Sequence, residues 1–193
     1  MPAYLHIDHI AKILTDNQYI LPKVFVETGT YDFVSGATIY HIWPHFRKLY
    51  TIEIVKEYSE RAKKKAELAG VTNITFLAGD STDVLPTVIS EINETALFWL
   101  DAHFCNDTIS PRGHGKIDPP LREEINAIFN GNKYQSIILI DNVSTFGLKN
   151  LPYENDWKRI TAEYLIQDIA PERIKRYYIE NDRLIILMNP LKT

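Results

Sequence analysis

Short apolar runs alternate with longer stretches of helical periodicity along most of the chain. Runs rich in branched and aromatic residues predict seven β-strands, at residues 23–27, 49–53, 73–77, 96–101, 136–141, 174–179 and 184–188. Apolar residues at helical spacing predict helices at residues 5–14, 37–46, 55–69, 82–92, 121–129 and 157–169. We expect Pro44 to shorten or kink the second helix and Thr82 or Asp83 to cap the fourth. Because the first five strands alternate with helices, the pattern predicts βαβ units and a parallel sheet.

The last two predicted strands depart from this alternation. They are separated by Glu180-Asn181-Asp182-Arg183, and the Asn-Asp pair favours a tight turn. A C-terminal hairpin adds one antiparallel strand, whereas a nicotinamide-binding fold usually continues the alternation. The pattern therefore predicts an α/β fold whose mostly parallel seven-stranded sheet ends in an antiparallel hairpin.

Length and composition limit the possible functions. The 193 residues fit a single domain over residues 1–193, with an N-terminal helix within residues 1–20. A net charge of −4 and a pI of about 5.9 argue against a nucleic-acid partner. The single cysteine, Cys105, excludes an intrachain disulfide and fits a reducing compartment. No apolar run approaches the ~18 residues of a membrane span, so we expect a cytoplasmic protein without a membrane segment. No pattern predicts its oligomeric state.

One long connection interrupts the predicted elements. Residues 104–120 include Pro111, Gly113, Gly115, Pro119 and Pro120. A connection of this length without regular structure is usually functional or disordered. We therefore predict that residues 104–120 form a lid loop.

Polar residues end the fourth and fifth predicted strands. Asp101 follows one buried run, and Asp141 and Asn142 follow the next. In an open α/β sheet, ligands bind beyond the carboxyl ends of the strands. Two carboxylates and an amide are hard oxygen ligands, which suit a divalent cation such as magnesium. Alternatively, the two aspartates cap helices or close turns.

Acidic residues also end the first three strands, in the segments Glu27-Thr28-Gly29-Thr30-Tyr31, Thr51-Ile52-Glu53 and Gly79-Asp80-Ser81. Gly29 allows the backbone to approach a ligand closely, and Glu53 is placed to accept the ribose hydroxyls of a nucleoside. The dinucleotide fingerprint G-x-G-x-x-G is absent, and an acid at Glu27 favours a cationic ligand such as a sulfonium. Capping explains one such acid, but four acids in register favour a shared ligand site.

In these motifs the sequence resembles class I S-adenosylmethionine-dependent methyltransferases, and in particular the cation-dependent O-methyltransferases of the catechol and caffeoyl-CoA type. It is also similar to poorly characterised bacterial methyltransferase-like proteins with Glu-Thr-Gly-Thr-Tyr and Phe-Trp-Leu-Asp-x-His segments. The resemblance spans roughly residues 23–188. It implies a Rossmann-like class I methyltransferase fold, with helices on both faces of the sheet, and methylation of a hydroxyl group.

The resemblance also implies roles for single residues. S-adenosylmethionine would be bound by residues at the first four strand ends, namely Glu27, Gly29, Thr30, Tyr31, Glu53, Ile54, Asp80, Ser81 and Asp101. Magnesium or another divalent cation would be held by Asp101, Asp141 and Asn142. The catechol-type enzymes have a lysine as general base three positions after the fourth-strand aspartate, where this chain has Phe104. His103 is the nearest substitute, so we predict His103 and Asp101 as catalytic residues.

Several functional alternatives stay open. Polar side chains in residues 104–120 favour a small-molecule or carbohydrate hydroxyl as the methyl acceptor. One alternative is a metal-independent methyltransferase in which His103 alone removes the proton. Another is a non-catalytic protein that keeps the cofactor fold for binding a partner. A nicotinamide-dependent oxidoreductase is disfavoured by the missing glycine fingerprint and the terminal hairpin.

Overall fold

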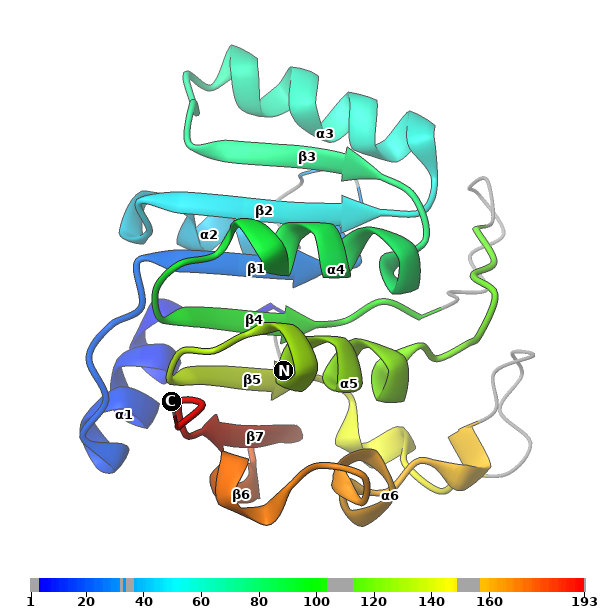
Figure 1. Cartoon of the computed structure of the whole chain (residues 1–193). Helices are drawn as coiled ribbons and strands as arrows, with labels where there is room; N and C mark the ends of the chain where they lie inside the picture. Colours follow the sequence, from blue (N-terminus) through cyan, green and yellow to red (C-terminus); the bar gives the residue numbers. More distant parts are fainter. Residues whose placement is uncertain (1–3, 32, 34–36, 104–112, 149–156, 193) are drawn as a thin grey trace.

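The seven predicted strands form one sheet in the computed structural model, which describes residues 4–31, 33, 37–103, 113–148 and 157–192 (Figure 1). Its spatial order is β3-β2-β1-β4-β5-β7-β6. The strands are β1 (Val24–Thr28), β2 (Lys48–Glu53), β3 (Ile74–Ala78), β4 (Ala96–Leu100), β5 (Ser136–Ile140), β6 (Ile174–Glu180) and β7 (Arg183–Met188). The first five run parallel, and β7 is antiparallel to both β5 and β6. The predicted C-terminal hairpin is therefore confirmed.

Six α-helices and four short 3-10 helices connect the strands within the described ranges. The α-helices are α1 (Ile7–Asn17), α2 (Thr38–Ile42), α3 (Lys56–Leu68), α4 (Ser81–Glu91), α5 (Leu121–Gly131) and α6 (Ala162–Ile166). The 3-10 helices are η1 (Trp43–His45), η2 (Val143–Thr145), η3 (Trp157–Arg159) and η4 (Pro171–Arg173). None of the described helices is both long and apolar enough to cross a membrane.

Helices cover both faces of the sheet and produce two hydrophobic cores. In Figure 1, α4 and α5 cross the front of the sheet, whereas α2 lies behind it. Residues of α4, α5 and α6 pack in one core with Val24 and Val26, and residues of α1, α2 and α3 pack in the other with Phe25. Successive side chains of a strand point to opposite faces, so a strand covered on both sides must be apolar at most positions. This requirement explains the continuous apolar runs of β4 and β5.

Two local predictions are wrong. Residues 157–169 do not form one helix, because Thr161 has an extended backbone and its hydroxyl accepts a hydrogen bond from Tyr164 N, which starts a new helix there. Helix α4 begins at Ser81, and its cap is Asp80 rather than Thr82 or Asp83. By contrast, the expected effect of Pro44 is confirmed, since α2 ends at Ile42 and Pro44 lies in η1.

The turn between β6 and β7 follows the predicted chemistry. Asn181 and Asp182 both have positive φ, at 52° and 62°. Such a pair of left-handed residues produces the twist that a two-residue hairpin turn requires. Arg183 follows the turn as the first residue of β7, which brings it to the carboxyl edge of the parallel strands.

Candidate functional site

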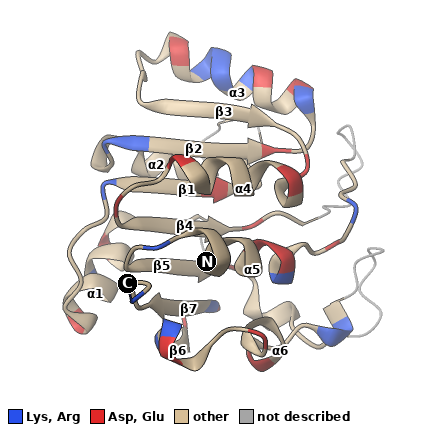
Figure 2. Ribbon diagram, viewed as in Figure 1, with Lys and Arg blue, Asp and Glu red and all other residues tan. Residues whose placement is uncertain are grey.

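A cleft opens at the carboxyl ends of β1 to β4, the edge at which open α/β sheets bind their ligands. Acidic residues lie at the arrowhead ends of β1 and β2 (Figure 2). The lining comes from four strand ends and from the segment after residue 112. It consists of Gly29, Ile52, Glu53, Ile54, Gly79, Asp80, Ser81, Ala102, His103, Gly113, Gly115, Ile117, Asp118 and Pro120.

Gly29 forms the closest backbone approach in the cleft. Its φ is +88°, and a Cβ atom at this position would lie 2.5 Å from the carbonyl oxygen of Asp101. Its amide donates to the carbonyl oxygen of Ile52 at 2.9 Å. Both the left-handed conformation and the contact with β4 therefore require glycine.

Glu53 is held in the cleft wall by main-chain amides. Its Oε2 accepts from Tyr31 N at 2.8 Å, and its Oε1 accepts from Val55 N at 2.9 Å. Burial raises the pKa of Glu53, although these amides oppose the rise. The carboxylate thus ties the first-strand turn to the second strand end and exposes an acidic edge to the cleft.

Asp80 joins α4 to the described part of the predicted lid. Its Oδ1 accepts from the amide and the hydroxyl of Thr82, and its Oδ2 accepts from Lys116 N at 2.8 Å. Burial opposes ionisation, but the hydrogen bonds outweigh it and leave the pKa of Asp80 below its usual range. The Lys116 ammonium also contacts Asp83 at 2.6 Å. Residues 113–120 therefore lie against the cleft, whereas residues 104–112 fall outside the described residues.

Glu27 lies beneath the cleft rather than in its lining. It is 1% exposed, and it accepts hydrogen bonds from the Thr51 hydroxyl at 2.6 Å and from Ile39 N at 3.3 Å. Thr30 hydrogen-bonds to the same Thr51 hydroxyl. Burial raises the pKa of Glu27 to about 8. These contacts make Glu27 a support for the first-strand turn, and its predicted role as a cofactor contact stays a prediction.

Glu124 is a buried acid that the sequence analysis missed. It lies on α5, is 0% exposed, and neither carboxylate oxygen makes a well-formed hydrogen bond among the described residues. Burial raises its pKa to about 7, although the nearby Ser81 and Thr28 hydroxyls partly oppose this. Its position between Leu121 and Ile128 on the apolar stripe of α5 was the available sequence signal.

His103, Asp101 and Asn142 come together at the end of β4. His103 Nε2 lies 3.6 Å from Asp101 Oδ1 and 3.4 Å from the Asn142 amide nitrogen. Asn142 also donates to Asp101 Oδ1 at 3.5 Å. Its backbone is left-handed, with φ of 61°. The rings of Trp157 and His103 pack in a T-shaped arrangement, with 5.6 Å between ring centroids, so the imidazole is positioned from several sides.

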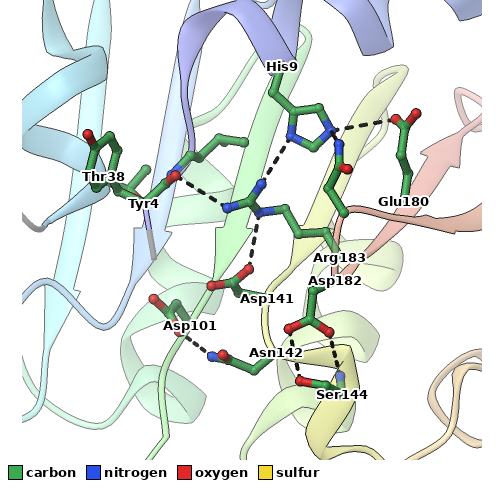
Figure 3. A network of polar contacts seen from close by, with 12 residues as sticks. Tyr4, His9, Thr38, Asp101, Asp141, Asn142, Ser144, Glu180, Asp182 and Arg183 are labelled. Carbon is green, nitrogen blue, oxygen red and sulfur yellow. Dashed lines mark hydrogen bonds and ion pairs between the residues drawn. The ribbon is translucent and has the colours of Figure 1, made fainter. Parts of the chain in front are cut away.

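Asp141 is paired with an arginine that the sequence analysis did not select. Its Oδ1 accepts from Arg183 Nε at 3.1 Å, and the two side chains are 9% and 10% exposed (Figure 3). Burial and the neighbouring Asp101 carboxylate raise the pKa of Asp141 to about 6, against the opposing effect of Arg183. Among the described residues, no group of three or more His, Cys, Asp and Glu side chains is arranged to hold a metal ion.

No protein-family model matches the sequence, and no curated protein matches it in sequence either. Solved structures do match the fold. A candidate methyltransferase from Streptococcus mutans in complex with SAH is 12% identical with a TM-score of 0.60, and the match covers 95% of this chain and 98% of that chain. The protein has the Rossmann-like fold of class I methyltransferases. The fold predicted from the strand-end motifs is thus confirmed.

Two further matches show that this methyltransferase fold does not fix the acceptor. A candidate O-methyltransferase from Klebsiella pneumoniae is 18% identical with a TM-score of 0.59, and the match covers 94% of this chain and 78% of that chain. An rRNA methylase from Streptococcus thermophilus is 13% identical with a TM-score of 0.55, and the match covers 97% of this chain and 98% of that chain. The acceptor must therefore be inferred from the cleft itself.

The fold brings about half of the predicted site residues into one cleft. Gly29, Glu53, Ile54, Asp80, Ser81 and His103 line it. Thr30 is buried under the first-strand turn, and Tyr31 is half-exposed with its ring against Tyr58. Asp101, Asp141 and Asn142 form the adjacent edge, where Asp141 is joined to Arg183.

Proposed function

We propose that this protein is an S-adenosylmethionine-dependent methyltransferase that methylates a hydroxyl group of a small molecule or sugar. The observation that supports this most is the shared cleft at four strand ends, in which Gly29, Glu53 and Asp80 meet. This is the edge of an open α/β sheet where ligands bind. A fold similar to that of an SAH-bound methyltransferase candidate supports the choice of cofactor.

The residues present fit this cofactor. In this proposal Gly29 and Tyr31, supported by Glu27, bind its amino-acid end beside Thr30 and Asp101. Glu53 lies in the cleft wall with its carboxylate oriented by two amides, which suits it to accept the two ribose hydroxyls. Ile54, Asp80 and Ser81 then provide the adenine position. When bound, the cofactor supplies an activated methyl group on a sulfonium.

His103 is the proposed general base. It lines the cleft, and Asp101, Asn142 and Trp157 fix its position. His103 would take the proton of the acceptor hydroxyl, and that oxygen would replace the sulfonium sulfur as the group bonded to the methyl carbon that the cofactor would supply. The protein's main contribution is to align the two reactants, and proton removal by a positioned histidine adds further acceleration.

The cation-assisted version of this reaction needs Asp101, Asp141 and Asn142 as ligands. As they lie, these residues do not fit a divalent cation, because Asp141 accepts from Arg183 and the Asn142 amide nitrogen points toward Asp101. A guanidinium and a divalent cation compete for the same carboxylate. The arrangement therefore favours the metal-independent reaction through His103.

Calorimetry with S-adenosylhomocysteine and a methyl-transfer assay test the proposal together. We expect wild-type protein and His103→Gln to bind S-adenosylhomocysteine equally, whereas His103→Gln slows single-turnover methylation of the best acceptor in a panel of glycosides and catechols by roughly 100-fold or more. His45→Gln, a change at an exposed histidine of η1, serves as the matched control.

Each result bears on one part of the proposal. No heat of binding would overturn the cofactor assignment, and a parallel titration with NAD would then test the oxidoreductase alternative. Binding without transfer to any acceptor would favour the non-catalytic alternative. Efficient methylation of simple catechols but not of glycosides would contradict the sugar assignment.

A further inference from the structure

The guanidinium of Arg183 donates hydrogen bonds to Asp141, His9 and Tyr4, and we call this set of contacts the Arg183 clamp. Nε donates to Asp141 at 3.1 Å, Nη1 donates to His9 Nδ1 at 3.2 Å and Nη2 donates to the Tyr4 carbonyl oxygen at 3.3 Å (Figure 3). The guanidinium carbon also lies 5.3 Å from the centre of the Trp99 ring, within the range of a cation–π contact. Each guanidinium nitrogen therefore has its own partner.

The neutral form of His9 is the one that can accept a hydrogen bond from Arg183. Burial, together with the positive charge of Arg183, lowers the pKa of His9. A neutral imidazole accepts from Arg183 through Nδ1 and keeps its proton on Nε2, which faces Glu180 Oε2 at 3.6 Å. Lys12 in turn binds Glu180 at 2.8 Å, so α1 and the β6–β7 turn together support the guanidinium.

We propose that Arg183 is a built-in counter-charge that occupies the cation position of the Asp101–Asp141–Asn142 edge and excludes divalent metal ions from it. The inference rests on the proposed function and deepens it, because it concerns the edge next to the cleft that contacts His103.

The geometry supports exclusion in two ways. A cation that binds Asp141 must either displace Arg183 or lie beside its positive charge, and like charges repel strongly where solvent is scarce. Displacement would break the contacts to Tyr4 and His9 and leave a buried guanidinium without its carboxylate, which is costly. Without Asp141, only one carboxylate and one amide remain, fewer protein ligands than a dedicated oxygen site normally offers.

Manganese binding measured by electron paramagnetic resonance tests this directly on the full chain. We expect wild-type protein and Arg183→Lys, which keeps the charge, to leave millimolar Mn²⁺ free. We expect Arg183→Met to bind Mn²⁺ at least tenfold more tightly than wild type. Asp141→Asn added to Arg183→Met should abolish this gain. Circular dichroism verifies that each variant is folded.

Two outcomes would overturn the inference. One is Mn²⁺ binding by wild-type protein that Asp141→Asn removes. The other is a folded Arg183→Met variant that binds Mn²⁺ no better than wild type. If Arg183→Met does not fold, wild-type crystals soaked in Mn²⁺ provide the test. An anomalous peak between Asp101 and Asp141 would contradict the inference. An intact Arg183–Asp141 pair without such a peak would support it. Because metal binding is the readout, failure here is distinct from a failure to bind S-adenosylhomocysteine.

Discussion

The two halves of the site stabilise their buried carboxyl groups in different ways. Beneath the proposed cofactor half, the cleft lined by Gly29, Glu53 and Asp80, Glu27 and Glu124 are fully buried, and burial raises their pKa values to about 8 and about 7. Protonation at neutral pH reduces the cost of burying them. At the proposed acceptor half, the edge formed by Asp101, Asp141 and Asn142, Asp141 is joined to the guanidinium of Arg183. Acidic residues that look equivalent in the sequence therefore differ in their protonation state and in the groups that stabilise them.

The largest expected effect is the loss of the buried ion pair. Asp141→Ala leaves the Arg183 guanidinium buried without its carboxylate, and we expect the free energy of unfolding to fall by about 3–5 kcal/mol. Asp83→Ala removes the exposed ion pair with Lys116 and should cost much less, because solvent screens exposed ion pairs. Urea denaturation measures both. Equal losses in the two variants would show that the Arg183–Asp141 pair has no special structural role.

A smaller effect concerns Glu124 and the dependence of the free energy of unfolding on pH. The folded protein binds a proton on Glu124 up to about pH 7, whereas the unfolded chain releases it near the usual value of 4.5. This contribution is complete below pH 4.5 and is lost as pH rises to 7, so stability should fall by roughly 3 kcal/mol over this window. Glu124→Gln should remove that part of the slope.

Comparison of wild type with Glu124→Gln isolates this contribution from that of Glu27, which has the same sign and extends to about pH 8. Denaturation midpoints at intervals between pH 4.5 and 8 provide the measurement. Parallel curves for the two proteins would show that Glu124 is ionised in the folded state.

The smallest expected effect concerns Glu53 in the cleft wall, where a substitution can remove the charge of the side chain and keep its size. Glu53→Gln keeps one carbonyl acceptor but loses the carboxylate that binds both Tyr31 N and Val55 N. We expect affinity for S-adenosylhomocysteine to fall about tenfold, which corresponds to one charged hydrogen bond of about 1.4 kcal/mol. Glu57→Gln, on the exposed face of α3, should not change the affinity. Unchanged binding by Glu53→Gln would remove Glu53 from the ribose site.

Much of the fold was predictable because a strand buried on both faces has a distinctive sequence. The runs in β4 and β5 are apolar at every position except Ser136, and Asn181-Asp182 fixes the final hairpin. The helix predicted at residues 157–169 failed because Thr161 interrupts it with a side-chain cap. Apolar periodicity does not register such a hydrogen bond, since Thr161 lies between apolar positions without disturbing their spacing.

The site was only partly predictable because its charged side chains pair with residues from distant segments of the sequence. Strand-end positions correctly placed Glu53 and Asp80 in one cleft. The partner of Asp141 depends on strand order and register: β7 lies next to β5, with Leu184 opposite Ile140, so Arg183 falls opposite Asp141. A sequence pattern shows that Arg183 follows the turn, but not which strand lies beside it.

The Arg183 clamp also determines when this edge of the cleft is completed during synthesis. Its Nη2 contact joins Tyr4 to a residue 179 positions later, and its Nε contact spans 42 positions. A ribosome makes Asp101 and Asp141 well before β7, and contacts between distant segments form late. The nascent chain therefore carries an acidic edge without its counter-charge until β7 emerges. This edge can therefore be completed only after β7 has been synthesised.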